Sequence, residues 1–574
     1  MVYYPNVYGQ GELFACSGFD SLTNYKSNFV GSLMGDKLGV LFHLKVRQEL
    51  AFEINSIRDI EYRAVTGDVI DCKLIKSNGN TSYPLQMVFV SAYLLAGVTT
   101  KAAYPYCIAE RAAKEEYIDN IKTNSSENEY TALAIKEEND RVYFGFGFSP
   151  ASRVEAIQTA KTGLELNIAS LVEERLSFFE KVEPCPTNDE KLARTYNKAF
   201  SVLRTNVMSA EGNIKGFWTT PNRVPHKDMW LWDSVFHAYG WQHYDYEFAF
   251  RVVEAVLETA HENGLIPIMA SPYSTLHITQ PPLLAWCVYK LYEKTNNISY
   301  IKKSYKALKG YIKWNMENKD TNKNYLYEWT LSGDRCGESG ADNSCRFDAA
   351  KQMDCVDFTS FMANESKYLM KMAEILGNDE DAKYYDNLFA KIKEALNKEL
   401  WDEREQIFCD RFLDGGFSRV KGLYSMLPLF AGLVSQERAD IMIEKHLKNP
   451  AELYTKVLFA TDAASEKTYS CDLWRGSTWV NYNYMIIDGL KKYGYSVLAR
   501  EAQLSTIKEI SKWYHQLGCI FEYYDSSATY IPALMVRKGP TTAPYDIRRK
   551  IFPVRDFGWT SALYIDMLHD LCKN

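Results

Sequence analysis

The sequence of 574 residues has no long apolar run and no strong excess of charge of one sign. Because about 18 consecutive apolar residues are needed to span a bilayer, we expect no membrane-spanning helix and no membrane partner. Lys and Arg number 66 and Asp and Glu number 73, a near balance that argues against a nucleic-acid partner. Hydrophobic residues at 46% and charged residues at 24% exclude disorder as a general description.

The twelve cysteines lack the spacing of metal or redox motifs. No CxxC pair occurs in the sequence, and no group of cysteines and histidines has zinc spacing, so we expect no metal and no other cofactor. The first residues show neither the basic nor the apolar segment of a secretory signal. These absences predict free thiols and a cytoplasmic setting.

Residues 1–150 are expected to form a β-sandwich domain. Short runs rich in Val, Leu, Phe and Ile, each bounded by turn residues, occur at 37–46, 49–54, 69–75, 86–92 and 142–148. Many short strands separated by turn signals are typical of a sandwich, and the run VYFGFGF at 142–148 alternates as a half-buried strand would. Residues 151–188 form a predicted helical linker, because apolar residues at helical spacing indicate one long helix over 152–182.

The remaining residues, 189–574, are expected to form a domain of helices. Apolar side chains recur at helical spacing in twelve segments: 189–208, 229–240, 245–262, 281–294, 299–316, 355–376, 380–399, 425–434, 436–447, 478–494, 497–514 and 558–572. Gly377 marks the predicted end of one of them. No repeat of fixed period is visible, so a closed α/α toroid is favoured over a solenoid, and the chain is multidomain and mainly α.

The first of two long loops, 319–354, contains the run GESGADNSCRFD. Long loops in a compact domain are usually functional, and this one gathers several charged and polar side chains: Glu338, Asp342, Asn343, Arg346 and Asp348. Neighbouring carboxylates or burial keep a carboxyl protonated near neutral pH, as acid catalysis on a glycosidic bond requires. The alternative is a solvated acidic loop closed by an arginine salt bridge.

The second long loop, 515–556, contains FEYYDSSA, in which Glu522 lies between aromatic residues. A carboxylate in such surroundings could be held against a sugar with a water molecule between the two. The alternative is a tyrosine-rich loop that packs on the domain surface.

A third motif, MWLWDSVFHAYGW at 229–241, opens a predicted helix. Aromatic residues make up 14% of the chain, and their faces stack on the C–H faces of sugars as well as filling cores. Trp230 and Trp232 could therefore form a sugar platform, with Asp233 binding hydroxyl groups. The alternative is a pair of core aromatics beside an aspartate that caps the helix.

Five motifs occur together: WDSVF (232–236), QPPLLAW (280–286), ESGADNSCR (338–346), WRGSTW (474–479) and FEYYD (521–525). In this order and context they resemble glycoside hydrolase family 63 and its trehalase relatives, which are inverting α-glycosidases with an (α/α)6 barrel. The resemblance covers roughly residues 190–574. It implies an (α/α)6-barrel catalytic domain over 189–574, preceded by the β-sandwich domain, and a mechanism without a metal.

The resemblance also implies roles for single residues. The aspartate of the ESGADNSCR motif, Asp342, would be the general acid, and the glutamate of the FEYYD motif, Glu522, would be the general base that activates water on the opposite face of the sugar. Trp230 and Asp233 match sugar-binding positions of the family. Further residues are implied as substrate-binding, site-shaping or acid-supporting: Trp232, Gln280, Glu338, Asn343, Arg346, Trp474 and Arg475.

Three positions depart from the family motifs, and they leave the catalytic pair untouched. Cys345 and Phe347 replace Pro and Trp, and Ser477 replaces a second Pro. The trehalase signatures PGGRF and QWDxPxGW are absent, which argues against trehalose. The expected function is that of an inverting, exo-acting α-glycosidase, with an α-glucosidase on a small glucoside or oligosaccharide favoured. The alternative is an α-mannosidase or a mannosylglycerate- or glucosylglycerate-type hydrolase.

Two other classes of function stay open on the sequence. A sugar epimerase on a similar toroid would abstract protons with histidines, and five of them lie close together in the sequence: His226, His237, His243, His261 and His277. A non-catalytic carbohydrate-binding protein would use the same carboxylates only to bind. A small carbohydrate is the expected partner in each case, and the sequence does not indicate an oligomeric state.

Overall fold

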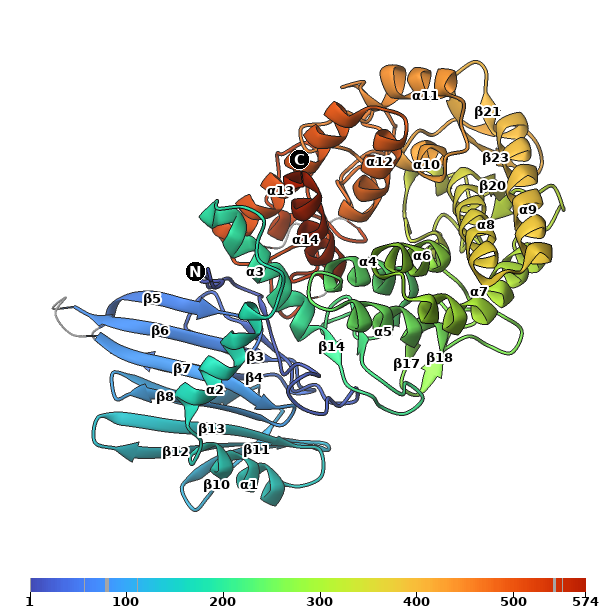
Figure 1. Cartoon of the computed structure of the whole chain (residues 1–574). Helices are drawn as coiled ribbons and strands as arrows, with labels where there is room; N and C mark the ends of the chain where they lie inside the picture. The colour runs from blue at the N-terminus through green and yellow to red at the C-terminus, as the bar shows by residue number, and fades with distance from the viewer. Residues whose placement is uncertain are drawn as a thin grey trace.

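The computed structural model describes residues 2–55, 57–77, 82–110, 112–539, 544–549 and 551–573. A β-rich region formed by the first 150 residues lies beside a larger helical region in Figure 1, and a linker joins the two. Residues 540–543 and 550 of the second predicted loop lie outside the described residues.

The β-rich region contains two antiparallel sheets. The first has the strand order β1–β2–β3–β4–β9, formed by Leu13–Phe14, Gly31–Leu33, Gly39–Phe42, Gln48–Ile54 and Ala103–Ala109. The second has the order β10–β11–β12–β13–β8–β7–β6–β5, formed by Lys114–Ile118, Ile121–Ser126, Glu129–Glu138, Arg141–Ser149, Leu94–Thr100, Ser82–Ser91, Val69–Lys76 and Ile57–Val65. Each of the five predicted strand runs overlaps a strand of these sheets.

The two sheets share one hydrophobic core. Phe144, Phe146 and Phe148 of β13 point into it together with Phe42 of the first sheet, and the ring centroids of Phe42 and Phe146 are 5.0 Å apart. Burial of such aromatic surface contributes about 25 cal/mol per Å². This shared core holds the sheets face to face.

The glycines that alternate with these phenylalanines allow close packing on the opposite face of β13. A Cβ atom on Gly145 would lie 2.1 Å from the carbonyl oxygen of Ala160, and one on Gly147 would lie 2.4 Å from that of Ala156. Both carbonyls belong to α1 (Arg153–Gly163), so this helix packs directly on the strand backbone. The strand is therefore covered on both faces, and its prediction as half-buried was wrong.

The linker consists of separate helices, and the prediction of one helix over 152–182 was wrong. After α1 ends at Gly163, α2 (Ile168–Leu176) begins behind Asn167, whose side chain accepts a hydrogen bond of 3.2 Å from the Ser170 N–H. A short 3-10 helix, η1 (Ser177–Glu180), follows. Asparagine favours this capping position over a helix interior, and the apolar spacing does not reveal that break.

Each of the twelve segments predicted in 189–574 contains a helix. They are α3 (Glu190–Thr205), α4 (Leu231–Trp241), α5 (Tyr246–Leu257), α6 (Leu284–Thr295), α7 (Ile298–Asn318), α8 (Val356–Leu376), α9 (Asp379–Glu399), α10 (Leu427–Ala431), α11 (Gln436–Met442), α12 (Val480–Lys492), α13 (Ser496–Leu517) and α14 (Gly558–Cys572). Gly377 ends α8 as predicted, at a φ of 70°, because glycine adopts the left-handed conformation at little cost.

Alternate helices contact one another in a closed ring formed by α4, α6, α8, α10, α12 and α14. The last, α14, packs on the first, α4, and the chain therefore returns to its starting point in Figure 1. The helices between them are less buried. For example, α9 buries a single stripe of Tyr385, Leu388, Ile392 and Leu396, whereas most of α8 is buried, as expected for an outer and an inner helix.

Short strands lie in the connections between these helices. They form four small sheets, namely β14–β15 (Val207–Met208, Trp218–Thr219), β16–β17–β18 (Met229–Trp230, Met269–Ser271, Ser274–Thr275), β19–β20–β23–β24 (Tyr327–Glu328, Met353–Cys355, Asp410–Phe412, Phe417–Ser418) and β21–β22 (Trp401–Asp402, Ile407–Phe408). Both predicted long loops are found as irregular connections between helices, before α8 and before α14.

A buried lysine joins the two regions of the chain. The side chain of Lys198 in α3 is 1% exposed, and its Nζ lies 2.7 Å from Glu12 Oε2 and 3.0 Å from Asp556 Oδ2. Asp556 Oδ2 also accepts a hydrogen bond of 2.8 Å from the Leu13 N–H, and its Oδ1 accepts one of 3.2 Å from the Ile520 N–H. The N-terminal strand, α3 and both ends of the second long loop therefore meet at one ammonium group.

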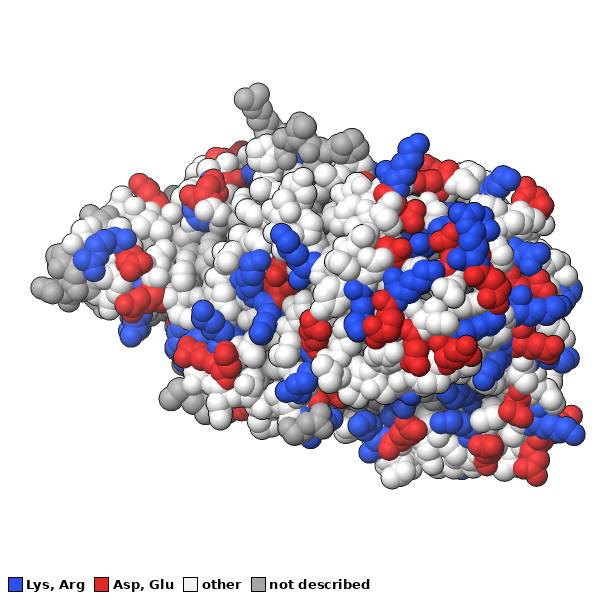
Figure 2. Space-filling model, turned by 90° about the horizontal axis from the view of Figure 1, so that it is seen from above, with Lys and Arg blue, Asp and Glu red and all other residues white. Residues whose placement is uncertain are grey.

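Charges of both signs are mixed on the surface. Over the helical region, the face seen in Figure 2 carries Lys and Arg interspersed with Asp and Glu, as the near-balanced composition predicts. All twelve cysteines carry free thiols. Among the described residues, no helix is long and apolar enough to cross a membrane.

The buried lysine yields a prediction about stability. We expect Lys198→Met to lower the free energy of unfolding by about 3–5 kcal/mol, because it leaves two carboxylates buried without a cation. Urea unfolding followed by circular dichroism measures the change. Lys191→Met removes an exposed lysine from the same helix and should change stability by less than about 0.5 kcal/mol. Equal unfolding curves for the two variants would contradict the prediction.

Candidate active site

A cavity of about 230 Å³ lies at one end of the ring of helices. Several of its lining residues lie in the first turns of inner helices or in the connections that precede them: Trp232 and Asp233 in α4, Gln280 before α6, Asp342 in the long loop before α8, Trp479 before α12 and Trp559 in α14. Helix N-termini carry partial positive charge and free N–H groups. This end of the ring therefore favours carboxylates and oxygen-rich ligands.

Seven of the eleven predicted site residues line this cavity, namely Trp230, Trp232, Asp233, Gln280, Asp342, Trp474 and Glu522. The remaining lining residues were not among the predicted site residues, although Gly337, Gly340 and Trp479 lie within the motifs. They are Pro221, His226, Ile268, Met269, Leu276, Ile278, Gly337, Gly340, Leu473, Trp479, Arg537, Lys538, Phe557 and Trp559. The cavity volume is below the roughly 300–1,000 Å³ of drug-sized sites, so the cavity suits a short glycoside.

The start of α4 presents Trp232 and Asp233 to the cavity. The Trp232 N–H donates a hydrogen bond of 3.2 Å to Gln280 Oε1. Asp233 is 3% exposed, and the N-cap of the helix is Trp230, which makes no side-chain cap, so the alternative of Asp233 as the cap is wrong. Burial, with a smaller contribution from the charge of Glu522, holds the pKa of Asp233 well above its ordinary value.

The loop that carries Asp342 passes directly over an indole ring. Gly340 has a φ of 71°, and a Cβ there would lie 2.3 Å from the Trp232 ring, so only glycine fits. The Cys336 N–H donates a hydrogen bond of 2.8 Å to the Asp342 carbonyl and closes the loop. One third of the Asp342 side chain is exposed, within the cavity, and its Oδ2 lies 3.7 Å from Lys538 Nζ.

Glu522 lies in an extended segment that is paired on both sides. Phe521 pairs with Arg555, and Tyr524 pairs with Thr478 of the WRGSTW motif. The glutamate is 4% exposed. Arg537 holds it through two hydrogen bonds, from Nε to Oε2 at 2.8 Å and from Nη2 to Oε1 at 3.0 Å. The two hydrogen bonds therefore hold the carboxylate in one position beside a positive charge.

The two predicted catalytic carboxyls have opposite electrostatic surroundings. Burial raises the pKa of Asp342, and the charge of Glu522 adds to it against the nearby cations Lys538 and Arg537. Burial would also raise the pKa of Glu522, but the charge and hydrogen bonds of Arg537 outweigh it and lower this pKa. The pKa of one carboxyl is thus shifted upward and that of the other downward, the directions that suit a general acid and a general base.

Tryptophans form much of the remaining cavity wall. Trp474 and Trp479 stack with ring centroids 3.5 Å apart, and the Trp232 and Trp559 rings meet edge to face at 5.3 Å. The buried Nε1 atoms of Trp230 and Trp559 have no hydrogen-bond partner among the described residues. Buried donors are normally paired, so these two indoles are suited to donate to hydroxyl groups of a ligand.

Two predicted site residues support the cavity without lining it. Glu338 is buried and pairs with Lys319, at 2.5 Å between Oε2 and Nζ. Asn343 donates from Nδ2 to the Asp472 carbonyl at 3.1 Å and accepts from the Trp474 N–H at 3.0 Å. Asn343 thus joins the Asp342 loop to the loop that carries Trp474.

The two predicted arginines also lie outside the cavity lining. Arg346 is fully buried in an ion pair with Asp357, and Asp410 Oδ2 lies 3.4 Å from its Nη1. Arg475 pairs with Asp348, from Nη1 to Oδ2 at 3.0 Å, near the surface. Neither guanidinium is placed to touch a ligand in the cavity, so the structure gives both arginines a scaffolding position.

Arg537, Lys538 and His226 line the cavity although the motifs did not indicate them. His226 Nε2 lies 3.2 Å from Arg537 Nη2. Arg537 and Lys538 belong to the second long loop, whose length marked it as functional while nothing in its sequence indicated which residue turns inward. Their separation from Glu522 by 15 and 16 positions hides the contact from motif analysis.

The histidines that kept a sugar epimerase open do not gather in the cavity. Of these five residues, His226 alone lines it. His237 is buried beside Thr219, with 2.9 Å between Nδ1 and Oγ1, and the rings of His261 and His277 pack together elsewhere. A pair of proton-abstracting histidines is therefore not formed by the described lining of the cavity.

Two departures from the family motifs have local structural reasons. The Cys345 N–H, which a proline would lack, donates a hydrogen bond of 2.7 Å to Asp462 Oδ2. Ser477 Oγ donates one of 2.8 Å to the Cys471 carbonyl. Both substitutions replace the rigidity of proline by hydrogen bonds that hold the same loops.

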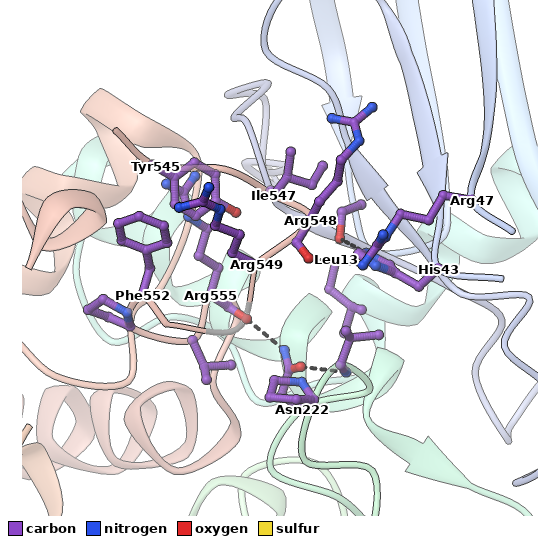
Figure 3. Close-up of a pocket in the computed structure, with 16 residues that line it drawn as sticks. Leu13, His43, Arg47, Asn222, Tyr545, Ile547, Arg548, Arg549, Phe552 and Arg555 are labelled. Atoms are coloured by element: carbon purple, nitrogen blue, oxygen red, sulfur yellow. Dashed lines mark hydrogen bonds between the residues drawn. The ribbon is translucent and has the colours of Figure 1, made fainter. Parts of the chain in front are cut away.

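The segment behind Glu522 forms the wall of a second cavity, between the β-rich region and the ring (Figure 3). Asn222 donates a hydrogen bond of 2.6 Å from Nδ2 to the Arg555 carbonyl. Val554 lines this cavity, and its N–H donates to Glu522 Oε2 at 3.2 Å. The β-rich region therefore backs the segment that positions Glu522, through residues that include Leu13, His43 and Arg47.

Comparison with known proteins gives one matching family model. It is described as the mannosylglycerate hydrolase MGH1-like glycoside hydrolase domain and covers residues 225–560. A mannosylglycerate hydrolase of Thermus thermophilus is 24% identical over 399 residues, which is 54% of this chain and 92% of that protein. An uncharacterized protein of Borreliella burgdorferi is 28% identical over 222 residues, which is 38% of this chain and less than half, 45%, of that protein.

Solved structures share the fold. The mannosylglycerate hydrolase of Thermus thermophilus, of glycoside hydrolase family 63 and in complex with Tris and D-glycerate, superposes with a TM-score of 0.54 at 21% identity over 65% of this chain and 99% of that chain. A bacterial glucoamylase complexed with acarbose superposes with a TM-score of 0.61 at 11% identity over 100% of this chain and 96% of that chain. The second likeness includes the β-rich region.

The arginine beside Glu522 yields a prediction about pH dependence. In Arg537→Met, burial acts on Glu522 without the opposing cation, so its pKa rises. A general base, the predicted role of Glu522, must be ionised to work, so we expect the acid limb of the kcat/KM profile to move up by about 1–3 pH units. Arg549→Met, which removes an exposed arginine of the same loop, should leave the profile in place. An acid limb that does not move in Arg537→Met would contradict the assignment of Glu522 as the base.

Proposed function

Because the chain belongs to the mannosylglycerate hydrolase MGH1-like glycoside hydrolase family, part of glycoside hydrolase family 63, we propose that it hydrolyses an α-glycoside of a hexose, mannose first, with a small acidic aglycone of the glycerate type. Asp342 is the proposed general acid and Glu522 the proposed general base of an inverting reaction. The relatives named mannosylglycerate hydrolase favour this alternative over the α-glucosidase that the sequence suggested.

The position of Lys538 supports an acidic aglycone. A general acid protonates the leaving oxygen, so the aglycone lies next to Asp342. Lys538 Nζ is 3.7 Å from the Asp342 carboxyl, and its side chain is 45% exposed in the cavity wall. A carboxylate on the aglycone would meet this ammonium group, whereas a neutral aglycone would make no ion pair with it.

Other residues of the cavity wall support a hexose. Asp233 is a buried carboxyl in the cavity wall, and the unpaired indole N–H groups of Trp230 and Trp559 lie in the same wall. Together they offer an acceptor and two donors to sugar hydroxyls, with the stacked Trp474 and Trp479 as an apolar surface. We therefore assign these residues to the sugar and Lys538 to the aglycone, with no metal in the reaction.

We also propose that the chain consists of a β-sandwich domain, a helical linker and an (α/α)6 barrel. The closed contacts among α4, α6, α8, α10, α12 and α14 support an (α/α)6 barrel over 189–574. The two sheets with one shared core support a β-sandwich domain over 1–150, with 151–188 as the helical linker. The likeness to the bacterial glucoamylase extends over the whole chain, which supports a fold that includes both regions.

The test of function is hydrolysis of α-mannosyl- and α-glucosyl-D-glycerate beside methyl α-mannoside, methyl α-glucoside and small α-gluco-oligosaccharides. The released anomer is followed by proton NMR. Fastest release of a β-hexose from a glycerate glycoside supports the proposal. Preference for an oligosaccharide would restore the α-glucosidase, release of the α-anomer would exclude inversion, and binding without hydrolysis of any substrate would favour the carbohydrate-binding alternative.

Substitution of each catalytic carboxyl separates the two roles. We expect Asp342→Asn and Glu522→Gln to reduce kcat by about 10²–10⁴-fold, because each removes one proton-transfer group. A substrate with an acidic phenol as leaving group needs no protonation, so it should restore much of the rate of Asp342→Asn and little of that of Glu522→Gln. Asp348→Asn, in the same loop and outside the cavity lining, is the control. Full activity of Asp342→Asn would contradict the assignment.

The aglycone assignment has its own test. We expect Lys538→Gln to raise KM for α-mannosyl-D-glycerate about tenfold and to leave KM for methyl α-mannoside unchanged, since a charge-assisted hydrogen bond contributes about 1.5 kcal/mol. The ratio of the two KM values cancels any influence of Lys538 on the pKa of Asp342. Lys538→Arg keeps the charge and should keep the ratio near that of the unaltered protein. Equal changes for both substrates would exclude a carboxylate at this position.

A further inference from the structure

Three ligand-type side chains meet at the end of the ring opposite the cavity. They are Glu183 after η1, His243 after α4 and His569 in the last turn of α14, and one ligand atom of each lies within 4.8 Å of the others. Both helices begin with cavity residues, Trp232 and Trp559, and end at this cluster. The cluster is therefore separate from the catalytic carboxyls.

The two imidazole rings lie in parallel and share one carboxylate. Their centroids are 4.0 Å apart with an angle of 11° between the planes. His243 Nδ1 lies 2.5 Å from Glu183 Oε2, and His569 Nδ1 lies 3.7 Å from Glu183 Oε1. Both Nδ1 atoms thus face the same carboxylate, one oxygen each.

The hydrogen bonds of Tyr196 determine the tautomer of His569. The Tyr196 hydroxyl donates to the Glu183 carbonyl at 2.7 Å, so its single proton is used there. It must then accept from His569 Nε2, at 2.9 Å, and Nε2 carries a proton. The neutral ring therefore turns the lone pair of Nδ1 toward a carboxylate oxygen, and two acceptors face each other without a donor between them.

His243 lies between two carboxylates, with Nδ1 against Glu183 and Nε2 3.0 Å from Asp566 Oδ1. Its ring stacks on that of His569 with 4.0 Å between the centroids. A single cation bound by both Nδ1 atoms and Glu183 would satisfy all three groups at once.

The outer nitrogen of each ring is held as in a metal centre. Metal-binding histidines usually donate their other N–H to a carboxylate or another oxygen, which orients the ring. Here His243 Nε2 pairs with Asp566, which also accepts from Tyr484 Oη at 2.6 Å and Gln242 Nε2 at 2.8 Å. His569 Nε2 pairs with Tyr196. These partners point both Nδ1 atoms at Glu183.

We propose that Glu183, His243 and His569 form a structural site for a divalent transition-metal ion, with zinc as the best match to two imidazoles and one carboxylate. The ion replaces the proton on His243 Nδ1, which leaves to solvent, and it fills the gap between His569 Nδ1 and Glu183. Water supplies the remaining ligand, since half of the Glu183 side chain is exposed at a cavity of about 610 Å³. The site fastens the linker to the ends of α4 and α14.

The test is titration of the full, chelator-treated chain with Zn²⁺ by calorimetry, with thermal unfolding in parallel. We expect one high-affinity ion per chain and a rise in the unfolding temperature. Glu183→Gln and His569→Gln each remove a direct ligand, so each should weaken binding by at least the roughly 10–100-fold typical of the loss of an outer-shell partner and abolish the rise. Glu180→Gln, an exposed glutamate three residues earlier, should behave like the unaltered chain.

Cobalt distinguishes this site from the thiols. Co²⁺ bound by two imidazoles and a carboxylate gives visible absorption without the intense near-ultraviolet band of thiolate ligands. That spectrum, lost in Glu183→Gln, supports the proposal. A thiolate band, absence of saturable binding, or equal affinity in the variants and in Glu180→Gln would overturn it. Zinc removal should leave kcat unchanged, and an ion required for turnover would overturn the structural role.

Discussion

The ammonium group of Lys198 is the interaction on which the active-site geometry depends. It pairs with Glu12, directly before the first strand, and with Asp556 of the second long loop, and all three side chains are 1% exposed. Asp556 in turn holds the Ile520 N–H, two residues before Glu522. A single buried charge thus ties the first residues of the chain to the segment that carries the proposed base. A buried ion pair adds little stability by itself, and here it specifies which three segments meet.

Two adjacent cations give one cavity two kinds of carboxyl. Arg537 is hydrogen-bonded to Glu522 through both ends of its guanidinium group, whereas Lys538 approaches Asp342 only to 3.7 Å. The closer, bidentate contact outweighs burial at Glu522, and the looser one leaves burial dominant at Asp342. The same short segment of loop therefore supports both the acid and the base of the proposed mechanism, and its Lys538 also faces the proposed aglycone.

The sequence was sufficient for what depends on local spacing. Helical periodicity located the helices α3 to α14, and the motifs named Asp342, Glu522 and five other residues of the cavity wall. Sequence analysis failed where tertiary contacts determine the direction in which a side chain points. Arg346 and Asn343 share a motif with Asp342, yet their side chains turn into the scaffold. Arg537 reaches Glu522 only through the path of the second long loop, and Glu183, His243 and His569 meet only through ring closure. No local pattern records either contact.

The glycine strip of β13 has a mechanical consequence. Because α1 lies against the strand backbone at Gly145 and Gly147, helix and strand touch without side chains that could slide or re-pack. The linker thus begins as an extension of the sheet, and α1 belongs mechanically to the β-rich region. Any hinge between the β-rich region and the ring of helices must then lie beyond Gly163, in the breaks that separate α1, α2, η1 and α3.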